Sequence, residues 1–328
     1  MKTKSEPIPF SFESATRTGT IKGLMYLPTE EKEDQNGSIL QPRFLVQIIH
    51  GMAEHMGRYH DFCRFLAKQG HAVCIFDLPG HGLSVNTPED LGYFGYPDGN
   101  RLVLNDVTKA ASVCQDKLTA LMSKDVALPR ILMGHSMGSF IARLYSIQPE
   151  AELAGAIYSG TSGPNPAALL GVLLARWSIL RHGPRYRDEF LSRLVAKGTL
   201  DRIDSPRTPW DWLSRDEAVV DQYIEDPLCG FTFTAAGYYD MFTWLRKVSK
   251  NSWFKQIPLQ LNILLVSGDQ DPIGQYGEGP KKIADRLRSS GHQVDLHLYE
   301  GGRHEMLNEI NRESVFNDIA AWLDRIEP

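Results

Sequence analysis

The 328-residue sequence has few of the features that mark secreted, membrane-spanning or metal-binding proteins. Its four cysteines lack the spacing of metal-binding motifs, and Cys74 lies in the apolar run AVCIF, which indicates a reduced, buried thiol. The N-terminus is polar and has no apolar signal-peptide core. The longest apolar run, residues 167–175, is about half as long as a membrane-spanning helix requires. We therefore expect a cytoplasmic protein without stable membrane insertion.

A strong charge of either sign is also lacking. The formal net charge is −5 and no block of lysines and arginines occurs, so we expect no nucleic-acid partner. Hydrophobic residues make up 42% and charged residues 23%, values that exclude a disordered or collagen-like chain. The length is sufficient to bury a large core. The composition therefore predicts a globular protein, whereas its function has to be inferred from sequence motifs.

Short apolar runs alternate with helical patterns through much of the chain. A β-hairpin is predicted within residues 1–28. The runs FLVQII (44–49) and AVCIF (72–76) are typical of strands buried on both faces of a parallel sheet, and residues 58–70 between them have helical spacing. This alternation predicts an α/β fold with a mostly parallel, doubly wound sheet.

Residues 162–256 interrupt the alternation with helical stretches rich in leucine, tryptophan, tyrosine and arginine. Strand patterns return at 261–272 and 294–302, before a closing helix. A helical insert between late strands predicts a lid (cap) over the carboxyl edge of the sheet, where open α/β sheets bind ligands. We therefore expect a core in two parts, residues 1–161 and 257–328, and a helical lid between them.

The segment ILMGHSMGSF (131–140) joins an apolar strand to a helix through two glycines that flank a serine. GHSMG fits G-x-S-x-G, the nucleophile elbow, in which the serine sits on a sharp strand-to-helix turn with its hydroxyl exposed. Glycines are needed there because a Cβ would collide with neighbouring backbone. By itself the pattern also fits a glycine-rich turn with a capping serine. The strand before it and the helix after it favour Ser136 as a nucleophile.

A serine nucleophile needs a base and an orienting acid, which in this fold follow it in the order Asp/Glu, then His. His304 lies in a glycine-rich loop after the last predicted strand, whereas His292 precedes that strand and His297 lies inside it. We therefore favour His304 as the base. The segment SGDQDP ends an apolar strand and offers two acids. We favour Asp271, which lies further out on the loop, and expect Asp269 to cap the turn.

The oxyanion of an acyl-transfer reaction needs two backbone N–H donors. One belongs to Met137, the residue after the predicted nucleophile. The other is predicted at Met52, because Gly51 lets the loop after the early strand turn sharply and leaves this N–H free to point inward. The two methionine side chains also fit plain apolar lining of the site, which is compatible with the backbone role.

Five segments carry these residues: HGMAEHMGRY (50–59), FDLPGHGLS (76–84), GHSMG (134–138), SGDQDP (267–272) and GGRHEMLNE (301–309). Together they resemble the monoacylglycerol lipase/lysophospholipase-like branch of the α/β-hydrolases, from about residue 10 to the end of the chain. The resemblance implies the α/β-hydrolase fold and a serine hydrolase that needs no cofactor or metal and cleaves a small acyl ester through an acyl-enzyme. It also implies Ser136, Asp271 and His304 as the triad, with Met52 and Met137 as oxyanion donors.

In monoacylglycerol lipases, a glutamate and an arginine of the first segment help shape the polar end of the pocket for the glycerol head. Here these residues are Glu54 and Arg58, and a structural ion pair that holds the loop explains them equally well. The lid departs from the animal enzymes in its aromatic residues, which are Trp177, Tyr186, Trp210, Trp212, Tyr238, Tyr239 and Trp244. The expected substrates are monoacylglycerol- or lysophospholipid-like esters, and smaller aryl or alkyl esters stay open.

Two other functions fit the same sequence. An amidase or aminopeptidase uses the same triad and needs an anchor for a free amine. Lid acids such as Asp216, Glu217, Asp221 and Glu225 could supply it, although such residues more often form a solvated helix face. A ligand-binding protein without turnover is disfavoured by an intact triad.

The lid segment LLGVLLARWSIL predicts either a weak contact with lipid or packing of its apolar face on the core.

Overall fold

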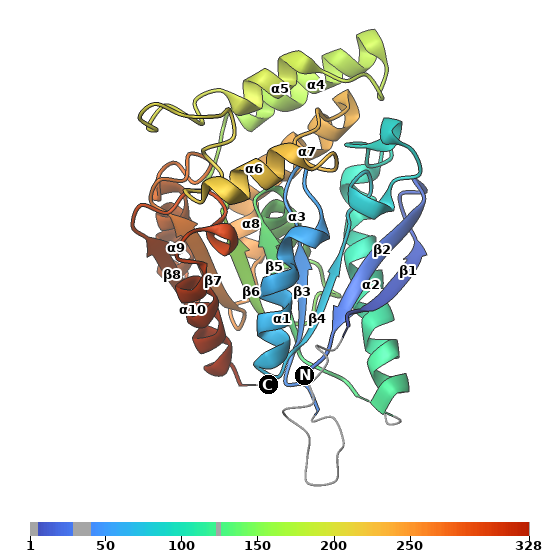
Figure 1. The fold of residues 1–328 in the computed structure, drawn as a ribbon, viewed down its shortest axis with the longest axis vertical. Helices are drawn as coiled ribbons and strands as arrows, with labels where there is room; N and C mark the ends of the chain where they lie inside the picture. Colours follow the sequence, from blue (N-terminus) through green and yellow to red (C-terminus); the bar gives the residue numbers. More distant parts are fainter. Residues whose placement is uncertain (1–5, 29–40, 123–125, 328) are drawn as a thin grey trace.

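The framework of the protein is a single eight-stranded sheet, seen in a computed structural model that describes residues 6–28, 41–122 and 126–327 (Figure 1). The strand order is β1-β2-β4-β3-β5-β6-β7-β8, in which β1 and β4 run antiparallel to β2 and all other neighbours are parallel. The strands are β1 (Ile8–Glu13), β2 (Thr20–Tyr26), β3 (Leu45–Ile49), β4 (Ala72–Phe76), β5 (Arg130–His135), β6 (Leu153–Ser159), β7 (Asn262–Gly268) and β8 (Val294–Tyr299). The mostly parallel α/β sheet predicted from the sequence is confirmed. Residues 1–5 of the predicted hairpin lie outside the described part.

Helices cover both faces of this sheet. They are α1 (His60–Lys68) and α10 (Arg312–Asp324) on one face, and α2 (Gly99–Met122), α3 (Met137–Tyr145) and α9 (Glu278–Ser289) on the other. Short 3-10 helices are η2 (Met56–Tyr59), η3 (Gly82–Ser84), η4 (Pro88–Asp90) and η5 (Met306–Asn308). Successive residues of β5 enter opposite cores: Ile131 and Met133 pack with α1 and α10, whereas Leu132 packs with α2 and α3. This two-sided burial explains why the strands appear in the sequence as continuous apolar runs.

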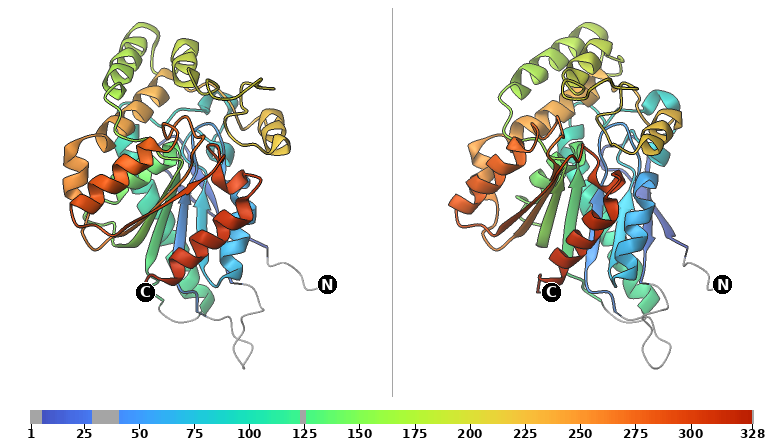
Figure 2. Two further views of the ribbon diagram at one scale, coloured as in Figure 1. Left: turned by 90° about the vertical axis from the view of Figure 1, so that its left-hand side faces the viewer. Right: turned by 60° about the vertical axis from the view of Figure 1, so that its left-hand side comes forward.

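A helical insert lies between β6 and β7, as predicted (Figure 2). It comprises α4 (Ala168–His182), α5 (Glu189–Ala196), α6 (Glu217–Glu225), α7 (Ala235–Val248) and α8 (Asn251–Gln256). Helices α4 and α5 are outermost, at the end of the molecule opposite the chain termini. Helix α7 instead packs against α3 and contributes Tyr238 and Trp244 to the main core. Within the described ranges, no helix has the length and apolarity needed to cross a bilayer.

The predicted functional residues follow parallel strands. Ser136 follows β5, Asp271 lies shortly after β7, and His304 lies shortly after β8. The segment of residues 50–55, here called the β3 loop, follows β3, and the insert follows β6. Because the carboxyl ends of parallel strands meet at one edge of a sheet, all five segments are brought to the same edge.

A glycine at the start of α3 tests how tightly this edge is packed. A Cβ added to Gly138 would lie 2.3 Å from the carbonyl oxygens of Ile49 and His50, so β3 or α3 would have to move. We expect Gly138→Ala to lower the free energy of unfolding by about 3 kcal/mol, measured by urea denaturation. Gly155→Ala in β6 is the control, because the three atoms nearest to its added Cβ are side-chain tips rather than backbone, at 2.9–3.0 Å. Equal losses in the two variants would contradict this interpretation.

Candidate active site

Ser136 occupies a strained turn between β5 and α3. Its φ is 51° and its ψ is −120°, a combination that residues other than glycine rarely adopt. Both flanking glycines are required by space, because a Cβ on Gly134 would lie 2.3 Å from the carbonyl oxygen of Gly138. Ser136 is partly exposed, whereas His135 and Met137 on either side are buried. This is the geometry of a nucleophile elbow, which presents the serine hydroxyl above the sheet.

Asp271 and His304 meet through a buried hydrogen bond. His304 donates from Nδ1 to Oδ1 of Asp271 over 2.9 Å, and both side chains are almost completely enclosed. The same carboxylate oxygen accepts the backbone N–H of Ile273 at 2.9 Å. With its proton on Nδ1, the neutral imidazole has Nε2 as its proton acceptor. The ring of His135, the residue before Ser136, lies 4.8 Å from that of His304, so serine and imidazole occupy the same corner of the sheet edge.

The other candidates considered from the sequence have different partners. Asp269 accepts the backbone N–H of Gly301 at 2.8 Å and so caps the turn. Both ring nitrogens of His292 lie 3.1 Å from backbone carbonyl oxygens. His297 lies within β8, where its ring packs near that of Tyr299. Of the three histidines considered, His304 is the one that hydrogen-bonds to Asp271.

The β3 loop packs directly against Ser136. A Cβ added to Gly51 would lie 2.7 Å from Oε1 of Glu54 and 3.2 Å from the Cβ of Ser136, so a glycine suits this close approach. Met52 follows in the turn, next to Ala53 with its positive φ of 50°. Met137 is the first residue of α3, where backbone N–H groups have no partner within the helix. The role of Met52 and Met137 as oxyanion donors stays a prediction, and this proximity supports it.

Glu54 and Arg58 lie in a buried ionic network. Arg58 donates to Glu54 at 2.8 Å and to both carboxylate oxygens of Glu305 at 2.6 Å, and Tyr59 donates its hydroxyl to Glu54 at 2.7 Å. Burial by itself raises the pKa of Glu54, but Arg58 and nearby histidines lower it to about 2. Since Glu305 follows His304, the network joins the β3 loop to the loop after β8. A direct contact of Glu54 or Arg58 with a substrate head group stays a prediction.

Glu305 and Trp212 did not emerge from the sequence as site residues. Glu305 carried a visible signal, an acid directly after the predicted base. Trp212, between α5 and α6, has its ring centre 4.9 Å from that of His304, and its carbonyl oxygen accepts the His304 backbone N–H at 3.3 Å. No local pattern indicates this contact, because the two residues are far apart in the chain.

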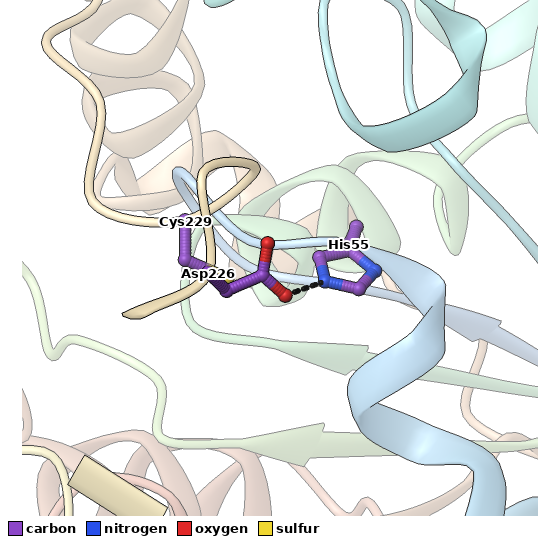
Figure 3. A group of neighbouring side chains, drawn as sticks. All are labelled: His55, Asp226 and Cys229. Atoms are coloured by element: carbon purple, nitrogen blue, oxygen red, sulfur yellow. Dashed lines mark hydrogen bonds and ion pairs between the residues drawn. The ribbon is translucent and has the colours of Figure 1, made fainter. Parts of the chain in front are cut away.

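His55, Asp226 and Cys229 place a nitrogen, an oxygen and a sulfur within 4.8 Å of one another, as a metal site would require (Figure 3). The Asp226 carboxylate points at His55, with 2.8 Å between Oδ2 and Nε2. However, the backbone N–H of Gly57 donates to Nδ1 of His55 at 3.1 Å, so Nε2 carries the proton and donates to Asp226. A metal on Nε2 would require a proton on Nδ1, facing the Gly57 N–H. The geometry therefore fits a hydrogen-bonded contact between the β3 loop and the insert better than a metal centre.

A serine on an elbow, a buried aspartate–histidine pair and a parallel sheet that collects them at one edge define a serine hydrolase with the α/β-hydrolase fold. A comparison with family models agrees with this class. The model of the Hydrolase_4 family, described as "Serine aminopeptidase, S33", matches residues 40–311, and the chain belongs to this family.

Relatives in the family include esterases and lipases. The monoacylglycerol lipase of Mycolicibacterium smegmatis is 27% identical over 282 residues, which cover 86% of this chain and 88% of the relative. The human monoglyceride lipase is 27% identical over 292 residues, covering 87% and 83% of the two chains. The crystal structure of a thermostable carboxyl esterase from Bacillus coagulans in complex with glycerol has a TM-score of 0.87 at 29% identity and covers 98% of both chains. These similarities make the protein a hydrolase of the esterase/lipase type.

The electrostatics of His304 predict the pH dependence of activity. Burial by itself lowers the pKa of His304, but the charge of Asp271 and its hydrogen bond raise it above the ordinary value of 6.5. A general base must be neutral, so the rate should fall as the pH drops through this raised pKa. We expect the acid limb of kcat/KM for a p-nitrophenyl ester to lie above pH 6.5.

Asp271→Asn should lower kcat by on the order of 10⁴ and move the acid limb to lower pH, because the carboxylate charge is lost. Asp269→Asn is the matched control and should leave the limb in place. An acid limb at the same pH in the wild type and Asp271→Asn would show that this aspartate does not set the pKa of the base.

Proposed function

We propose that the protein hydrolyses carboxylic esters of the monoacylglycerol or lysophospholipid kind, through a Ser136–His304–Asp271 triad and an acyl-enzyme. The observation that carries this proposal is the buried Asp271–His304 hydrogen bond at the sheet edge where the Ser136 elbow lies. The relatives named monoacylglycerol and monoglyceride lipase support a glycerol ester as substrate. The glycerol named with the esterase structure supports the same class.

In the proposed reaction, Nε2 of His304 takes the hydroxyl proton as Oγ of Ser136 attacks the ester carbonyl carbon. The carboxylate of Asp271 stabilises the imidazolium, and the N–H groups of Met52 and Met137 bind the oxyanion. Collapse of the intermediate breaks the ester C–O bond, and His304 gives its proton to the departing alcohol. Water then attacks the acyl-enzyme by the same route, which releases the acid and restores the serine.

The family description favours an amidase or aminopeptidase as the second candidate. A peptidase of this kind needs an anchor for the free amine of its substrate. Two of the four insert acids considered for this task have close arginine partners: Asp216 pairs with Arg312 at 3.1 Å, and Asp221 pairs with Arg207 at 2.7 Å. Carboxylates that already pair with arginine are poor anchors for a substrate amine, which supports an ester as substrate.

The outer face of the insert supports a weak contact with lipid. Seven large apolar side chains on α4 and α5 are exposed: Leu169, Leu170, Leu173, Trp177, Leu180, Phe190 and Leu194. Exposed Arg176, Arg181 and Arg193 lie on the same helices. An apolar face with arginines beside it suits a shallow contact with an anionic lipid surface.

A cytoplasmic location is part of the same proposal, and the four buried free thiols are in keeping with it.

Replacing the nucleophile tests the chemistry. Ser136→Ala should lower kcat by on the order of 10⁶ and abolish fluorophosphonate labelling, while the melting temperature falls little. Rates across monoacylglycerols, p-nitrophenyl esters of graded chain length and aminoacyl-anilides then define the substrate class. Ser314→Ala on the exposed face of α10 is the control. Near-wild-type hydrolysis by Ser136→Ala would refute the triad, and faster turnover of anilides than of esters would favour the peptidase.

Replacing apolar residues of α4 tests the lipid contact. The double variant Leu173→Ser/Leu180→Ser should bind phosphatidylglycerol vesicles at least about tenfold more weakly in co-sedimentation, because each leucine loses on the order of 1.5 kcal/mol of apolar transfer. Hydrolysis of a short, soluble ester should not change. Leu259→Ser, at an equally exposed position outside the insert, is the control. Equal binding by all three proteins would exclude α4 as the lipid-contacting face.

A further inference from the structure

One segment of the insert, residues 211–216, is bonded along its length to residues 303–312, the chain around the predicted base. These two stretches are here called the bracing segment and the base segment. Backbone N–H groups of His304 and Glu305 donate to the carbonyls of Trp212 and Leu213, at 3.3 and 2.8 Å. In addition, Arg303 of the base segment donates to two carbonyl oxygens of the bracing segment, at 2.5 and 3.0 Å. The bonds therefore hold the backbone of the insert directly against that of the base.

Charged side chains strengthen this attachment. Arg215 pairs at 3.0 Å with Glu309, whose side chain is completely buried, and Arg312 pairs with Asp216 at 3.1 Å. Removing Arg215 from Glu309 would leave a buried carboxylate without its cation, which is costly. The bracing segment is therefore a fixed part of the site, unlike the exposed outer helices of the insert.

This attachment places the side chain of Trp212 next to the His304 imidazole. Its ring centre lies 4.9 Å from that of His304, at an angle of 42° between the ring planes. Trp210, only two residues earlier, packs on Tyr223 instead, at 5.0 Å. Trp212 is partly exposed, whereas its neighbours Asp211 and Leu213 in the bracing segment are buried. The tryptophan is thus placed at the imidazole by the backbone bonds described above.

An aromatic ring in contact with an imidazole has two consequences for a general base. It restricts the rotation of the imidazole about its side-chain bonds, which keeps Nε2 aimed at one place. Its electron-rich face also attracts a cation, so it favours the imidazolium that forms when the base accepts a proton. Neither effect requires the tryptophan to touch the substrate.

We propose that Trp212 is a positioning residue, which orients the His304 imidazole and stabilises its protonated form. This inference rests on the proposed role of His304 as general base. The other ionisable groups around His304 are Asp271 at Nδ1, His135 from the end of β5, Glu54 from the β3 loop, and Glu305 with its partner Arg58. All of these remain in the variants below, so a change in the titration of His304 reports on the tryptophan.

The kinetic experiment compares Trp212→Leu, Trp212→Phe and Trp210→Leu. We expect Trp212→Leu to lower kcat about tenfold at little change in KM, and to move the acid limb of kcat/KM about half a pH unit lower. Trp212→Phe should keep most of the wild-type kcat and most of the wild-type position of the acid limb. Trp210→Leu removes an aromatic ring from the same stretch of the insert and should leave the limb in place. An unmoved limb in Trp212→Leu would overturn the proposal, as would an equal shift in Trp210→Leu.

A second measurement is independent of turnover. A protonated imidazole quenches the emission of an adjacent tryptophan, so the emission of Ser136→Ala should titrate with the pKa of His304. This transition should disappear in Ser136→Ala/Trp212→Phe and persist in Ser136→Ala/Trp210→Phe. If the transition survives the loss of Trp212, the inference fails even where the wild type is an active esterase. If the transition behaves as expected but no ester is hydrolysed, the proposed function fails and the contact between tryptophan and imidazole stands.

Discussion

The hydrogen bond between Asp271 and His304 is the interaction on which the site depends. It is buried, and a buried carboxylate is costly unless hydrogen bonds or a cation compensate it. Oδ1 has two donors, whereas Oδ2 of Asp271 is buried without a hydrogen-bond partner among the described residues. A positive charge on the imidazole adds a Coulombic attraction to this carboxylate. Within the proposed mechanism, this arrangement favours the state in which His304 holds the serine proton.

The loops that carry this pair are held by further buried charges. Arg58 bridges Glu54 of the β3 loop and Glu305 beside His304, so the loop that carries Met52 and the loop that carries the predicted base are tied to one cation. The negative charges of Glu54 and Glu305 also favour a protonated His304. In contrast, burial and the nearby His304 lower the pKa of His135 to about 4, so this second imidazole stays neutral at ordinary pH. The pKa values of the two neighbouring histidines are therefore shifted in opposite directions, because their environments differ.

The insert has two parts with different physical character. Its inner part, which contains α7 and the segment of residues 211–216, is packed on α3 and bonded to the loop after β8. Its outer part, α4 and α5, exposes apolar side chains. The inner part therefore belongs to the candidate site, and within the proposed function the outer part suits the delivery of an apolar substrate. Membership of the family does not determine whether the substrate is an ester or an amide, because the same triad cleaves both. The residues around the triad decide which of the two substrates is bound.

The fold and much of the candidate site follow from local patterns in the sequence. Apolar runs with turn signals predict the parallel strands, and G-x-S-x-G between a strand and a helix predicts the elbow at Ser136, because strand, turn and helix are each determined by neighbouring residues. The order of acid and base, and their place after strands, predicts Asp271 and His304, the two residues that share the hydrogen bond.

Tertiary structure alone decided which distant side chains meet. From the sequence, Arg58 fits either a contact with a substrate head group or a structural ion pair. Its partner Glu305 is identified only by the packing of the β3 loop against the loop after β8. The contact between Trp212 and His304 likewise joins the insert to the segment after the last strand. Such pairs leave no local pattern in the sequence, because their contact depends on how the sheet and the insert bring remote segments together rather than on the conformational preference of either segment.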